Sequence, residues 1–119
     1  MKYYLILPML FLCSVLIAQD QLSSESSEKL VIENEKLKVV EHFSMSQGDV
    51  CGEGLHHHEP HLTIVINDAK VQITTEEGEA QVIKVNSGTS IWSESEKHSV
   101  INIGENPTKM LLIYLKEQD

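Results

Sequence analysis

Short strand-like segments separated by turn residues fill most of the chain, and their spacing restricts the possible folds more than any other feature. The segments are residues 37–45, 62–66, 71–75, 81–85, 89–92, 99–103 and 110–115. Many short strands with a turn at about every 8–12 residues are typical of an all-β sandwich or barrel. No stretch after residue 30 shows helical periodicity. We therefore expect one all-β domain over residues 30–116.

The first 29 residues do not follow that pattern. Lys2, an apolar run over residues 3–17 and the small residue Ala18 have the order of a secretory signal peptide. We expect export to the periplasm or the medium, with cleavage after Ala18. An uncleaved membrane anchor is the alternative, although the run is shorter than the roughly 20 residues of a membrane span and contains Pro8. Residues 19–29 are rich in Ser and Glu, which predicts a disordered lead-in.

The chain that follows Ala18 is acidic. It contains 8 lysines, no arginine and 18 acidic residues, for a net charge of about −10. This charge argues against nucleic acid or an anionic membrane surface as a partner. Cys51 is the only cysteine in this part of the chain, so an exported form contains no internal disulfide.

Four of the six histidines lie within residues 56–61, directly before the most apolar of the expected strands. His56 and His58 are two positions apart, so on a strand their side chains leave the same face. Neutral imidazole is a common ligand for transition metals, and two on one face form half of a metal site. His98 begins another expected strand, which can lie beside the first in an antiparallel sandwich. The alternative is a solvated, histidine-rich loop.

These residues resemble the two motifs of the cupin superfamily. The first cupin motif has Gly, then His-x-His, a Glu three or four residues later, and a Gly after a hydrophobic strand. Gly52 or Gly54, followed by His56 and His58, matches its beginning. The second motif has Gly, a turn and His-x-x-x-Asn.

Gly88, His98 and Asn102 match this second motif, with the spacing from His to Asn intact. The resemblance covers residues 30–116. It implies a cupin-type double-stranded β-helix, or jelly-roll barrel, with a metal site inside. It also implies that a homodimer is possible, because cupins often pair through sheet edges. Asn102 lies two residues beyond Val100 on the strand face of His98, and we expect it to be a hydrogen-bond partner behind the ligands.

Two departures from the cupin pattern affect the site. Leu62 stands where the ligating glutamate is expected, and leucine cannot bind a metal. His61 is next to it and is a possible fourth ligand, although in a regular strand it would face away from the other ligands. Pro60 can interrupt that regularity. In the second motif, residues 94–96 replace the usual proline and glycine, and the turn is one residue shorter.

The expected function is an exported small cupin that binds a divalent metal through His56, His58, His98 and His61. The metal can be Fe, Zn, Ni or Mn, and the reaction is unassigned. One alternative is a metalloenzyme, such as an iron-dependent dioxygenase or an isomerase or lyase on a small molecule. Another is a metal-free barrel that binds a small ligand. Whether the protein is an enzyme stays open, and Cys51 is a further, soft candidate ligand.

Overall fold

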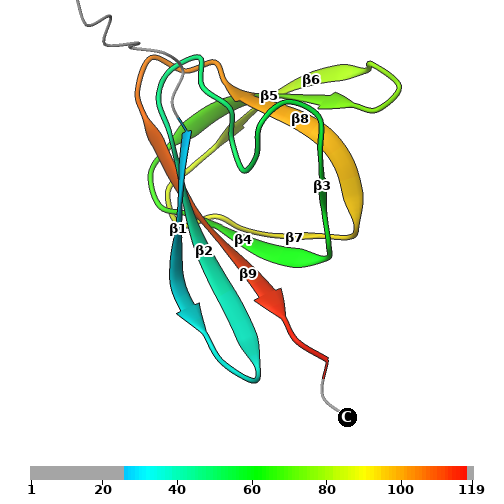
Figure 1. Ribbon diagram of the computed structural model, residues 1–119. Coiled ribbons are helices and arrows are strands. Elements are labelled where there is room, and N and C mark those ends of the chain that lie inside the picture. The colour runs from blue at the N-terminus through cyan, green and yellow to red at the C-terminus, as the bar shows by residue number, and fades with distance from the viewer. Residues whose placement is uncertain (1–25, 118–119) are drawn as a thin grey trace, which may run out of the picture.

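The computed structural model describes residues 26–117, and all of its regular elements there are β-strands (Figure 1). The strands are β1 (Ser26–Glu33), β2 (Leu37–Ser44), β3 (His56–His58), β4 (His61–Val65), β5 (Ala69–Thr75), β6 (Ala80–Val85), β7 (Ser90–Ser93), β8 (Glu96–Asn102) and β9 (Thr108–Leu115). The all-β prediction is confirmed. Among residues 26–117, no helix is long and apolar enough to cross a membrane.

The strands form two antiparallel sheets in the arrangement of a jelly roll. The five-stranded sheet has the order β1-β2-β9-β4-β7, and the four-stranded sheet has the order β3-β8-β5-β6. Figure 1 shows β3 at the side of the barrel, next to β8, while β1 lies at the outer edge beside β2. Consecutive strands β3 and β4 belong to different sheets, so the chain crosses from one sheet to the other at the histidine-rich segment.

The core lies between the two sheets and consists mainly of β-branched and aliphatic side chains. Its buried members are Val50, Val65, Ala69, Val71, Val100, Met110 and Leu112. Burying each larger aliphatic side chain contributes about 1.5–3 kcal/mol to folding. On β2 the buried face includes His42 and Ser44, so polar groups point into the barrel from the same strand face as Val40.

Two expectations concern the N-terminal segment. The expected signal peptide, residues 1–18, lies outside the described residues, as do residues 19–25 of the expected disordered lead-in. The last four residues of that lead-in, 26–29, belong to β1, so the expectation of disorder is wrong for them. All eight residues of β1 are exposed, and the backbone ladder to β2 therefore orders this strand rather than burial of its side chains.

Candidate metal centre

Strand pairing brings three of the four predicted ligands together. In the antiparallel pair of β3 and β8, His56 lies directly opposite His98. Their ring centroids are 4.9 Å apart, and the His58 ring is 4.6 Å from His56 and 5.6 Å from His98. His57, between the two β3 ligands, is exposed and contacts Ser95 Oγ at 2.9 Å. The alternation of the strand thus separates two inward imidazoles from one outward imidazole.

The Nδ1 atoms on β3 are tied to oxygen atoms outside the cluster. His56 Nδ1 lies 2.8 Å from the Gly54 carbonyl oxygen, and His58 Nδ1 lies 2.8 Å from the Tyr114 hydroxyl. A carbonyl oxygen only accepts hydrogen bonds, so His56 donates from Nδ1 and its neutral ring presents a lone pair at Nε2. Histidines that bind metals are commonly oriented by such a bond at the other ring nitrogen.

His58 Nε2 and His98 Nδ1 are buried and have no hydrogen-bond partner among the described residues. His58 as a whole is only 7 % exposed. An unsatisfied buried polar atom costs about 1–3 kcal/mol, so such atoms call for a partner. His98 Nδ1 is 3.3 Å from a carboxylate oxygen of Glu96, a contact that becomes an ion pair only if the ring is protonated. The donor set of the cluster therefore fits a bound metal ion.

His61 also faces the interior, although simple alternation places it on the opposite face. It begins β4, is 3 % exposed, and its ring centroid lies 5.0 Å from that of His58. The separating residues Glu59 and Pro60 belong to neither strand, and proline has no N–H to continue the ladder. His61 Nδ1 donates to the Glu59 carbonyl at 2.7 Å, which leaves its Nε2 free to accept.

Cys51 lies against the imidazoles from the loop between β2 and β3. Its Sγ is 3.4 Å from His56 Nε2 and 3.9 Å from His98 Nε2. With His58, these residues form a group whose four donor atoms all lie within 4.8 Å of one another. Gly52 permits this approach, since a Cβ there would lie only 2.7 Å from His56 Cγ.

Burial shifts the pKa values of His58, His98, Cys51 and Tyr114 toward their neutral forms. Desolvation, aided by the neighbouring histidines, lowers the pKa of His58 to about 4. Burial also lowers the pKa of His98, although Glu96 opposes this. Burial raises the pKa of Cys51 and of Tyr114 to about 12 each. Around pH 7 and without a cation, the site therefore holds neutral His58 and His98, a thiol and a phenol.

Sequence reasoning missed His42. It is 6 % exposed on the inward face of β2, and burial lowers its pKa, with further contributions from His56 and His61. The signal was present in the alternation of β2, in which His42 shares a face with Ser44. It was not recognised because His42 lies 14 residues upstream of His56, on a strand of the other sheet.

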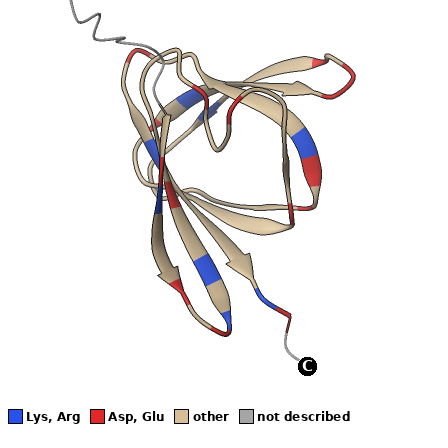
Figure 2. Ribbon diagram, in the orientation of Figure 1, with Lys and Arg blue, Asp and Glu red and all other residues tan. Residues whose placement is uncertain are grey.

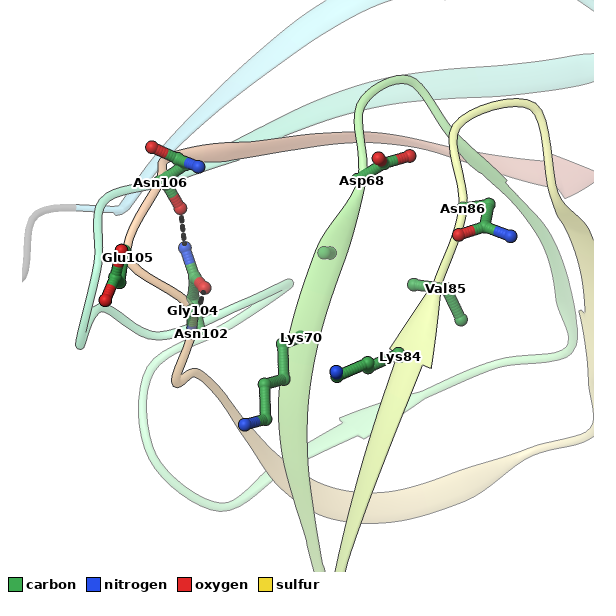
Figure 3. Close-up of a pocket in the computed structure, with 10 residues that line it drawn as sticks. Asp68, Lys70, Lys84, Val85, Asn86, Asn102, Gly104, Glu105 and Asn106 are labelled. Atoms are coloured by element: carbon green, nitrogen blue, oxygen red, sulfur yellow. Dashed lines mark hydrogen bonds between the residues drawn. The ribbon is translucent and has the colours of Figure 1, made fainter.

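The expected role of Asn102 beside the ligands is wrong. Asn102 is fully buried at the far end of β8, where its Nδ2 donates to the carbonyls of Ser44, Met45 and Asn106 at 3.3, 3.3 and 2.9 Å. Figure 3 shows it beside a surface hollow, directed at Asn106. His98 and Asn102 do share a strand face, but Val100 lies between them. Asn102 therefore joins loops and does not orient a ligand.

Trp92 neither packs in the core nor lines the cavity. It is 50 % exposed on β7, and its Nε1 donates to Glu94 at 3.1 Å. The neighbouring Ile91 and Ser93 point to the other face, which is the inward one.

An apolar cavity of about 200 Å³ adjoins the histidines inside the barrel. Aliphatic side chains such as Val65, Ile91 and Leu112 form most of its wall. Cys51, His61, Glu96 and His98 also reach this wall. A carboxylate is thus present beside the imidazoles.

The fold matches solved cupin structures. A cupin domain protein from Bordetella pertussis Tohama I has a TM-score of 0.69 and 23 % identity, over 77 % of this chain and 94 % of that one. A polyketide cyclase from Streptomyces resistomycificus has a TM-score of 0.59 and 17 % identity, over 78 % and 66 % of the two chains. A cupin superfamily protein from Desulfitobacterium hafniense DCB-2 has a TM-score of 0.57 and 15 % identity, over 78 % and 79 %.

The sequence matches no known family model and no curated protein. At these identities the structural likeness establishes the fold alone. The chain therefore has the cupin fold, and the resemblance inferred from its two motifs is confirmed at that level.

Proposed function

We propose that this is an exported small protein that binds one divalent metal ion through the Nε2 atoms of His56, His58 and His98. The observation that carries the proposal is His58 Nε2, which is buried without a partner in the middle of the imidazole cluster. A metal ion would supply the partner that this nitrogen lacks, and the Nδ1 contacts of His56 and His58 already hold both rings.

The same site supports a second candidate function, a metalloenzyme that acts on a small molecule. The apolar cavity beside the histidines gives room for a small ligand, and Glu96 places a carboxylate at its wall. A bound divalent ion would polarise an oxygen group of such a ligand. Glu96 is suited to accept or donate a proton there, since its carboxylate lies 3.3 Å from His98 Nδ1. A polyketide cyclase with this fold supports the enzyme candidate.

Charge supports a small molecule over a nucleic acid as the ligand. Lysines and acidic residues are interspersed along the strands and loops (Figure 2), and acidic residues are in excess overall. The turn between β5 and β6 carries Glu76, Glu77 and Glu79. A polyanion would meet net repulsion at such a surface.

The test is elemental analysis of the protein purified without a histidine tag. We expect about one equivalent of Fe, Zn, Ni or Mn, and loss of it in His56→Ala and His98→Ala. His57→Ala is the matched control, because this exposed neighbour should leave the metal content unchanged. Absence of metal, together with no uptake on dialysis against each ion, would favour the metal-free barrel.

We also propose that β1 mediates a homodimer. Leu30, Val31 and Ile32 are 54 %, 44 % and 51 % exposed on this edge strand, whose outer side has no partner strand among the described residues. An apolar, unpaired edge readily accepts a second strand. Sedimentation velocity should show a dimer that Ile32→Lys converts to monomer, while a monomeric wild type would refute it.

Export is checked by mass spectrometry, which should find a mature N-terminus at Gln19.

A further inference from the structure

We infer that Cys51 is the fourth ligand of this metal centre. Its thiolate takes the place of the glutamate carboxylate of the cupin pattern, which is absent here because Leu62 stands at that position. The centre then has three imidazole nitrogens and one sulfur. Such a donor set suits zinc or copper and disfavours manganese, which prefers carboxylate and carbonyl oxygen. The inference rests on the proposed function, and it assigns the position that sequence reasoning gave to His61.

The distances around Cys51 match those of a shared ion. Around a tetrahedral zinc ion, the Zn–S and Zn–N bond lengths place sulfur and nitrogen about 3.6 Å apart. Cys51 Sγ lies 3.4 Å from His56 Nε2 and 3.9 Å from His98 Nε2, on either side of that value. His58 completes the group of four donors within 4.8 Å of one another.

A thiol hydrogen bond alone does not explain this arrangement. The single proton of a Cys51 thiol can be given to His56 Nε2, at 3.4 Å, but then not to His98. Neither choice gives a partner to His58 Nε2, which is buried and unpartnered within the same group. One ion at the centre satisfies the thiolate and all three imidazoles together.

His61 fits the fourth position less well. None of its atoms belongs to the group of four donors, although its ring lies beside His58, at 5.0 Å between centroids. It also packs against Tyr114, with 5.3 Å between ring centroids. His61 therefore lies next to the centre, on the wall of the apolar cavity.

The backbone around Cys51 is built to hold the sulfur in place. The N–H of Val50 donates to the Val100 carbonyl on β8 at 2.8 Å, and the Val50 side chain is 2 % exposed. Cys51 itself adopts φ 57°, a left-handed conformation that few residues other than glycine adopt. Gly52 follows. Because it has no Cβ, the His56 ring can pack closely against it; a Cβ there would lie only 2.7 Å from His56 Cγ.

The test is the absorption spectrum of the cobalt-loaded protein. A Cys51 thiolate bound to Co²⁺ produces sulfur-to-metal charge-transfer absorption in the near ultraviolet. We expect this absorption in wild type and in His57→Ala, and its loss in Cys51→Ser and Cys51→Ala. Zinc binding by the two cysteine variants should weaken about tenfold or more, since one of four ligands is lost. Circular dichroism of the metal-free variants verifies that they fold.

A second measurement needs no variant. Iodoacetamide treatment followed by peptide mass spectrometry reports the alkylation of Cys51, which bound zinc should slow strongly. If wild type binds one equivalent of metal without charge-transfer absorption, and Cys51→Ala retains its affinity, the cysteine assignment is wrong while the proposed function stands. Loss of metal in His61→Ala would then give the fourth position to His61. If wild type binds no metal at all, the proposed function itself fails.

Discussion

His56 on β3 and His98 on β8 face each other across one antiparallel pair, with their ring centroids 4.9 Å apart. The two residues are far apart in the sequence, and only the register of this short pairing brings them together. A shift of one residue would turn one ring to the outer face. The proposed metal centre therefore depends on the correct pairing of a three-residue strand.

Replacement of His58 should abolish stabilisation by metal. An ion at a concentration one hundred times its Kd stabilises the folded state by about 2.7 kcal/mol. For a domain of this size, that corresponds to roughly 10–20 °C in Tm. We expect such a rise for wild type and for His57→Ala when zinc is added, and almost none for His58→Ala. Thermal denaturation with and without zinc checks this, and an equal rise in His58→Ala would contradict it.

The stability of the metal-free protein should fall on mild acidification. The pKa of His58 is about 4 in the folded protein, against 6.5 for an unperturbed ring. Between these values the unfolded state binds the proton and the folded state does not, so stability decreases as pH falls from 6.5 to 4. A pKa difference of one unit corresponds to about 1.4 kcal/mol. The free energy of unfolding should therefore decrease by an amount on the order of 2–3 kcal/mol over this pH range.

Urea denaturation at pH 7 and pH 4.5 measures this loss, and His58→Gln should reduce the difference. An unchanged wild-type stability over this range would show that His58 titrates normally.

The unperturbed histidine pKa predicts that metal binding weakens near pH 6.5. Burial shifts the protonation of His58 to more acidic pH, so this ligand is not the one that limits binding there.

Gly52→Ala should disturb both stability and metal binding. The added Cβ would lie 2.7 Å from His56 Cγ, so the ring has to move. Gly54→Ala is the matched control, since it also has a positive φ, 55°, but nothing lies within 4 Å of its Cβ. Both variants strain the backbone, because φ is positive at each glycine; at Gly54, in the left-handed α region, this costs about 1–2 kcal/mol. Only Gly52→Ala should also lower zinc affinity, as calorimetric titration would show, and equal affinities would argue against ring displacement.

Asn102→Ala should destabilise the fold without altering the metal. Its amide donates to three backbone carbonyls and its Oδ1 accepts from the Gly104 N–H. Leaving such buried groups unpaired costs about 1–3 kcal/mol each, so unfolding should require clearly less urea. One equivalent of zinc should still bind at unchanged affinity. A selective loss of metal would restore Asn102 to a role behind His98.

The sequence predicted β2 and β4 to β9, because turn residues act locally and mark where these strands end. It did not predict β1, whose order comes from pairing with β2. It also placed His56 and His58 on one face, since alternation along a strand is a local property. The same rule was wrong for His61, because Pro60 ends the ladder and β4 enters the other sheet.

Other features of the site depend on contacts between distant segments. Cys51 reaches His98 only because its loop pairs with β8 through Val50 and Val100. His42 enters from a strand of the opposite sheet, and no spacing along the chain reveals this. The outward direction of Trp92 on β7 likewise depends on the pairing of that strand.

Anomalous diffraction from crystals of the zinc-loaded protein tests the central claim most directly. A zinc ion bound by imidazole lies about 2.0–2.1 Å from the ligating nitrogen. We predict one strong anomalous peak at that distance from the Nε2 atoms of His56, His58 and His98. No peak at these three histidines, or a peak only at the exposed His57, would contradict the assignment of a metal centre to this barrel.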